Sequence, residues 1–147
     1  MLDARHPEDS RERVQAMIEA AGVPYNPPPE RVPNSQKALQ VTELARDREL
    51  HEPVHARLMR AYWSEARDIG DEPTLLELVA EAGLDREEAA AALADERYAD
   101  RVAASTQEAN RHGINAIPAF VLGRRLLLLG AQPEQVFERA LEQLGTG

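Results

Sequence analysis

The sequence contains no cysteine among its 147 residues. The chain by itself therefore has no disulfide, no thiolate nucleophile and no thiolate ligand for a metal. Aromatic side chains are also scarce, at 4% of the residues with a single tryptophan. Basic residues are outnumbered, 17 against 26 acidic ones, and the net charge is −9. Nucleic-acid binding needs clustered Lys and Arg, so that class of partner is excluded.

Long hydrophobic runs are absent as well. No apolar stretch is long enough to span a bilayer, and residues 1–9 are mostly polar or charged. We therefore expect no signal peptide, no membrane partner and a cytoplasmic location. A chain of this length can bury a core without covalent staples. No cofactor is expected.

Apolar residues recur at helical spacing along most of the sequence. The expected buried faces of the second and fourth helices are Ala38, Val41, Leu44 and Ala45, and Leu75, Leu76, Leu78 and Val79. Capping residues, first-turn prolines and terminal glycines mark the expected helix ends. The third helix is expected to turn Leu58, Met59, Tyr62 and Trp63 inward. The expected helices begin at Pro7, at Asn34 or Ser35, at Pro53, at Asp71, at Asp85 (with Glu88 completing a capping box), at Tyr98 and at Pro133.

Strands are expected only near the C-terminus, at residues 119–122 and 125–129. The uninterrupted apolar run from Leu126 to Leu129 suits a strand that is buried on both faces. A two-stranded hairpin alone is marginally stable in water, so a further segment or another chain should complete the sheet. We expect a homodimer through this hairpin, with the C-terminal helix around Phe137 at the interface.

A series of short motifs occurs in a fixed order along most of the chain. In this order and spacing they resemble the DsbA superfamily of thioredoxin-fold proteins, closest to its FrnE-like branch of cytoplasmic dithiol oxidoreductases. The 2-hydroxychromene-2-carboxylate isomerases and kappa-class glutathione transferases are near neighbours. The motifs are Pro33-Asn34-Ser35, Arg60-Ala61-Tyr62-Trp63, Arg67-Asp68-Ile69, Ala80-Glu81-Ala82-Gly83-Leu84-Asp85, residues 113–121 and Gly130-Ala131-Gln132-Pro133.

The resemblance implies an α+β, mostly helical chain with a partial DsbA-like thioredoxin fold. Residues 1–112 would form a helical, insertion-type region. Residues 113–147 would form the thioredoxin-fold remnant, with a cis-proline loop, a β-hairpin and a last helix, and the two would make a single compact unit. In the family, a strand, a helix bearing Cys-x-x-Cys and another strand precede the insertion, and this chain begins where they end.

The chain is therefore expected to be a truncated thiol-disulfide oxidoreductase of this family, redox-inactive as given because it lacks the catalytic cysteines. One alternative is a non-catalytic module that binds a peptide or small ligand. Another is the remnant of a glutathione-dependent isomerase or transferase, in which a serine would contact the thiol. A misplaced start codon, a deliberate truncation and a natural one are equally compatible with the sequence.

No catalytic residue is assigned. The resemblance implies a cis Ile117–Pro118 bond, with Ala116, Ile117 and Pro118 contacting an extended peptide or a glutathione-like ligand through the backbone. Asn34 and Ser35 are candidates for the same groove, and the alternative is that they cap the second helix. Tyr62 and Trp63 are expected to be core or groove anchors.

Residues 51–55 match the zinc-protease pattern H-E-x-x-H. That chemistry needs both imidazoles on one face of a continuous helix. Because Pro53 lacks a backbone donor, we expect the helix to begin there and to leave His51 outside, so no metal is expected. His112 precedes a helix-ending glycine, and we expect it to interact with the helix dipole rather than to act in catalysis.

Overall fold

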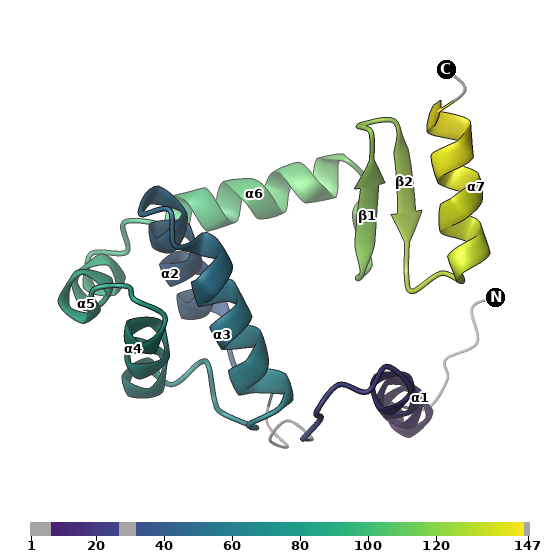
Figure 1. The fold of residues 1–147 in the computed structure, drawn as a ribbon. Coiled ribbons are helices and arrows are strands. Elements are labelled where there is room, and N and C mark those ends of the chain that lie inside the picture. The colour runs from purple at the N-terminus through teal and green to yellow at the C-terminus, as the bar shows by residue number, and fades with distance from the viewer. Residues whose placement is uncertain (1–6, 27–31, 146–147) are drawn as a thin grey trace. The chain divides into compact units, whose positions relative to one another are not determined.

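The computed structural model describes residues 7–26 and 32–145. The described part is mostly helical and ends in a small antiparallel hairpin followed by a helix, which confirms the expected fold class (Figure 1). No described helix is both long and apolar enough to cross a membrane. The elements are α1 (Pro7–Ala20), α2 (Gln36–Asp47), α3 (His51–Trp63), α4 (Glu72–Glu81), α5 (Arg86–Ala94), α6 (Ala99–Arg111), β1 (Ala119–Leu122), β2 (Leu126–Leu129) and α7 (Glu134–Gly145).

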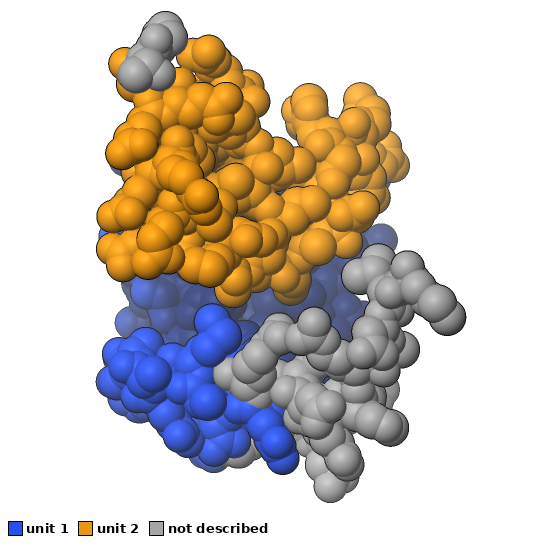
Figure 2. Space-filling model, turned by 90° about the vertical axis from the view of Figure 1, so that its right-hand side faces the viewer, with its two compact units in different colours: residues 1–102 blue, residues 103–147 orange. Residues whose placement is uncertain are grey.

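The chain divides into two compact units, residues 1–102 and 103–147, which Figure 2 colours separately. We expected a boundary after residue 112 within a single compact unit. The observed boundary lies inside α6 because Val102 is the buried residue of this helix, whereas the side chains of residues 103–108 are exposed. The first turn of α6 therefore belongs to the first unit, and the rest of the helix belongs to the second.

The core of the first unit is formed by α2, α3, α4 and α5, which pack against one another. The apolar spacing of α2 and α4 predicted their buried faces correctly. Burying such side chains completely contributes roughly 1.5–3 kcal/mol each. The largest fully buried side chains are Val41, Leu44, Val54, Leu75, Leu78 and Val79.

Aspartate caps start α4 and α5. A carboxylate oxygen of Asp71 accepts the backbone N–H of Thr74 at 3.0 Å, and Asp85 accepts the N–H of Glu88 at 2.7 Å. Both bonds satisfy a first-turn donor that has no partner within the helix. In the expected capping box, the Glu88 side chain would in turn accept the N–H of Asp85. The Glu88 carboxylate pairs with Arg48 instead.

Two expectations for α3 are wrong. The helix begins at His51 rather than at Pro53. First-turn N–H groups have no partner within a helix. Pro53, the third residue of α3, therefore loses no helical hydrogen bond through its missing N–H. In addition, Met59 and Trp63 are exposed by 38% and 37% rather than turned into the core, while Leu58 is buried as expected.

In the second unit, β1 and β2 pair antiparallel, with Ala119 opposite Leu129 and Leu122 opposite Leu126. The second strand begins at Leu126, one residue later than expected. The expectation that it is buried on both faces is wrong for the described chain, because none of its leucines is fully buried and Leu127 is 38% exposed. The sheet has two strands here, and α7 packs against β1.

Candidate functional site

The segment between α6 and β1 leaves backbone groups accessible. Gly113, with a φ of +74°, ends the helix, and the N–H of Ile114 turns back to the carbonyl of Ala109 at 3.0 Å. The Ile117–Pro118 bond is cis, and the Pro118 carbonyl accepts the N–H of Gly130 at 2.7 Å. Within the described residues, the N–H and C=O of Ile117 make no hydrogen bond, and its side chain is 91% exposed.

The two faces of the hairpin have different surroundings. On one face the Phe120 ring meets the ring of Phe137 from α7 edge to face, with centroids 4.9 Å apart. The register places Leu122, Leu126 and Leu128 on this same face. The opposite face carries Val121 and Leu127, which are 57% and 38% exposed. The second unit thus leaves one apolar face of its sheet largely uncovered.

The uncovered face continues into a hollow of about 470 Å³ near the hairpin turn. Arg124 and Arg125 line it, and neither forms an ion pair within the described part of the chain. His112 also lines it, with Nε2 3.9 Å from a carboxylate oxygen of Glu108 on α6. The remaining lining residues are Ile114, Val121, Leu126 and Leu127.

A larger apolar groove lies in the first unit, between α1 and the end of α3. Its volume is about 740 Å³. This groove was not predicted from the sequence, although a groove contact was one of the two roles expected for Trp63, which lines it. The lining residues are Met17, Ile18, Ala21, Val23, Pro24, Met59, Arg60, Trp63, Ser64 and Glu65.

The candidate groove residues Asn34 and Ser35 lie in the first unit, at the start of α2. The Asn34 side-chain oxygen accepts the N–H of Gln36 at 3.0 Å, and Ser35 makes no side-chain capping bond. The Asn34 backbone lies against Gly70, where an added Cβ would come within 2.9 Å of the Asn34 carbonyl oxygen. The Asn34 side chain thus bonds the first residue of α2, while Ser35 occupies the N-cap position.

His51 and His55 share a face of α3, contrary to the expectation based on Pro53. Their rings are stacked, with centroids 5.8 Å apart and planes inclined by 12°. No group of three or more potential metal ligands occurs among the described His, Asp and Glu residues. Zinc sites in proteins use at least three protein ligands, so this pair alone does not make one.

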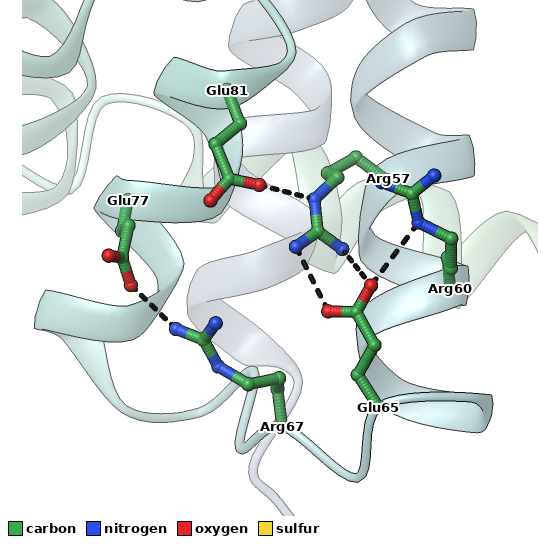
Figure 3. A network of polar contacts seen from close by, with 6 residues as sticks. All are labelled: Arg57, Arg60, Glu65, Arg67, Glu77 and Glu81. Carbon is green, nitrogen blue, oxygen red and sulfur yellow. Dashed lines mark hydrogen bonds and ion pairs between the residues drawn. The ribbon is translucent and has the colours of Figure 1, made fainter. Parts of the chain in front are cut away.

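The carboxylates with lowered pKa values belong to ion-pair and capping contacts of the first unit. Hydrogen bonds from Arg57 hold the pKa of Glu65 below its ordinary value of 4.5. Figure 3 shows Glu65 between Arg57 and Arg60, with Arg57 also contacting Glu81. Hydrogen bonds from Arg101 and Tyr98 likewise lower the pKa of Asp47. These contacts link α3 to α4 through Arg57 and Glu81, and α6 to α2 through Arg101 and Asp47.

Known proteins share this architecture. A model of the DSBA-like thioredoxin domain matches residues 4–142. The uncharacterized protein YwbO of Bacillus subtilis (strain 168) is 29% identical over 130 residues, which cover 87% of this chain and 64% of that protein. The crystal structure of the probable DsbA oxidoreductase SCO1869 from Streptomyces coelicolor matches with a TM-score of 0.82 and 34% identity, covering 92% of this chain and 58% of that one.

The chain thus spans about three fifths of the length of these relatives. The family match nevertheless includes nearly all of the residues described above, from α1 through the cis-proline loop and the hairpin to α7. The chain therefore belongs to the family of DSBA-like thioredoxin domains.

Proposed function

We propose that this chain binds an extended peptide segment without exchanging disulfides itself. Family membership supports an origin among thiol-disulfide oxidoreductases. Disulfide exchange proceeds by thiolate attack through a mixed disulfide, and the sequence contains no sulfhydryl group that could form one. The observation that carries the proposal is the exposed Ile117 at the entrance to β1, whose backbone N–H and C=O have no partner in the part of the chain that the structure describes.

Ile117 has the groups that a peptide needs for strand addition. Its N–H can donate to a carbonyl of the peptide, and its C=O can accept an N–H in return. Pro118 has no N–H and its carbonyl is already bound to Gly130, so the pairing centres on Ile117 and the preceding Ala116. The exposed Ile117 side chain would contact an apolar side chain of the bound segment.

A labelled peptide without free thiols tests this proposal. Reduced and alkylated insulin B chain is titrated with the protein and followed by fluorescence anisotropy. Ile117→Glu should weaken binding by about fivefold or more, because it brings a charge to an apolar contact. Leu141→Glu is the matched control, since Leu141 is an apolar residue of α7 that is 58% exposed. Equal binding by both variants would contradict the proposal, and so would insulin reduction by the pure protein.

We further propose that the chain is related to the FrnE-like branch, and that the dithiol of such an oxidoreductase lies outside these 147 residues. The chain covers 64% and 58% of the lengths of the two relatives, which leaves room for such a segment. The reading frame upstream of Met1 tests this point. An in-frame Cys-x-x-Cys would support it, whereas a serine at that place would favour a glutathione-dependent isomerase or transferase with a glutathione-like ligand.

A homodimer through the hairpin is a separate proposal. Val121 and Leu127 expose an apolar face, and a two-stranded sheet gains stability from added strands. Arg124 and Arg125 lack acidic partners among the described residues and could pair with Glu108 of a second copy across a two-fold axis. Light scattering at micromolar concentration should give twice the monomer mass and a lower mass for Val121→Glu. A stable monomer of the wild-type protein would overturn this proposal.

A further inference from the structure

The groove between α1 and α3 has the size and lining of a small-molecule site. Its volume of about 740 Å³ lies in the range of roughly 300–1,000 Å³ that is typical of ligand pockets. Met17 comes from α1, whereas Met59 and Trp63 come from α3. Methionine side chains adapt to irregular apolar ligands, and the indole adds a flat surface.

Most polar groups of the groove already have partners within the protein. The Ser64 hydroxyl donates to the carbonyl of Pro24 at 2.7 Å. Both carboxylate oxygens of Glu65 are bound by Arg57, at 3.1 and 3.0 Å. Neither group is therefore available to a ligand without losing an existing hydrogen bond.

Arg60 differs from these groups. Its Nε lies 3.2 Å from Glu65, and its side chain is 64% exposed. Figure 3 shows this single contact beside the two-pronged contact of Arg57 with the same carboxylate. The terminal guanidinium nitrogens of Arg60 donate no hydrogen bond to the described residues. The groove thus offers one cation with free donors next to an apolar lining.

We propose that this groove binds a small amphiphilic carboxylate, with its apolar body between α1 and α3 and its carboxylate on Arg60. A planar carboxylate matches the fork of a guanidinium group through two parallel hydrogen bonds. A single negative charge suits the site, since Arg60 is the one cation among the described residues that line the groove. This site is independent of the peptide contact at Ile117.

Trp63 makes the proposal directly measurable, because it is the only tryptophan of the chain and it lines the groove. Dodecanoate, below its micelle concentration, is titrated into the full chain while tryptophan emission is recorded. We expect a saturable change, with binding weakened about tenfold or more by Arg60→Gln, because charge-assisted hydrogen bonds are lost. Arg46→Gln is the matched control and should bind as the wild type does, since Arg46 is an exposed arginine of α2 that does not line the groove.

Dodecanol separates the apolar contribution from the charged one. It should bind the wild type and Arg60→Gln equally. Met17→Glu, on the α1 wall, should abolish binding of both ligands while circular dichroism remains that of the wild type. The proposal is overturned if dodecanoate produces no saturable change, if Arg60→Gln binds it as tightly as the wild type, or if light scattering shows that Met17→Glu separates a dimer in which a second copy fills the groove. Ile117→Glu should leave dodecanoate binding unchanged.

Discussion

The rings of Phe120 and Phe137 meet edge to face with centroids 4.9 Å apart, which joins β1 to α7. They are the only two phenylalanines in the sequence. Such aromatic pairs contribute roughly 0.5–1.5 kcal/mol beyond the burial of their surface. In a unit with a two-stranded sheet, this contact holds the last helix on the hairpin.

Phe137→Ala should therefore loosen the second unit. We expect a loss of about 2 kcal/mol in the local opening free energy, which is below the loss for a fully buried ring. Hydrogen exchange of the β1 and β2 amides measures this opening. Glu138→Ala, at an exposed position of the same helix, is the control. Equal protection in both variants would show that the hairpin does not depend on α7.

Arg57 and Arg60 contact the same carboxylate, but they should differ in their contribution to stability. The Arg57 side chain is 10% exposed and also binds Glu81 at 2.6 Å, whereas that of Arg60 is 64% exposed. We expect Arg57→Met to lower the free energy of unfolding by about 2 kcal/mol, because it leaves Glu81 without its partner and Glu65 with Arg60 alone. Arg60→Met should cost less than about 1 kcal/mol. Urea unfolding monitored by circular dichroism distinguishes the two, and a larger loss for Arg60→Met would contradict the structure.

The lowered pKa of Glu65 makes part of the stability depend on pH. The folded state favours the ionised carboxylate, so this contribution is present above the ordinary pKa of 4.5 and is lost as the pH falls through the lower folded value. Glu65→Gln should be less stable than the wild type at pH 6, and the difference should shrink as the pH approaches 3. Thermal unfolding across this range is the measurement. A difference that stays constant with pH would rule out the charge as its cause.

Gly70 lies where the backbone of Asn34 approaches it closely. An added Cβ would meet the Asn34 carbonyl oxygen at 2.9 Å and its nitrogen at 3.0 Å. Gly70→Ala should therefore cost about 1–3 kcal/mol, because backbone atoms must move to make room. Gly145→Ala is the control, since a Cβ there meets nothing within 4 Å. A neutral Gly70→Ala would mean that the loop before α2 adjusts freely.

The stacked His51 and His55 should not retain zinc. No third ligand joins them among the described residues, and zinc sites use at least three protein ligands. Purified protein dialysed against buffer should contain no stoichiometric zinc by elemental analysis. His55→Ala should change stability by less than about 0.5 kcal/mol, because His55 is exposed. Stoichiometric zinc that disappears in His51→Ala would refute this expectation.

Local interactions let the sequence determine most of the helices and the hairpin. A cap such as Asp71 or Asp85 bonds an N–H only three residues away, so its effect can be predicted without knowing the fold. The apolar spacing of α2 and α4 and the strands around Gly123 were predicted for the same reason. The start of α3 was not, because a first-turn proline fits a helix that begins at His51 as well as one that begins at Pro53.

Only the tertiary structure decided which apolar side chains are covered. Periodicity places Leu58 and Met59 near the same side of α3, but the core covers Leu58 and leaves Met59 at the groove. The same holds for the hairpin, where Phe120 meets Phe137 of α7 and Val121 on the other face is 57% exposed. The free N–H of Ile117 and the free guanidinium nitrogens of Arg60 are likewise tertiary properties. Burial and pairing depend on which distant segments meet, and sequence spacing encodes only the geometry within one element.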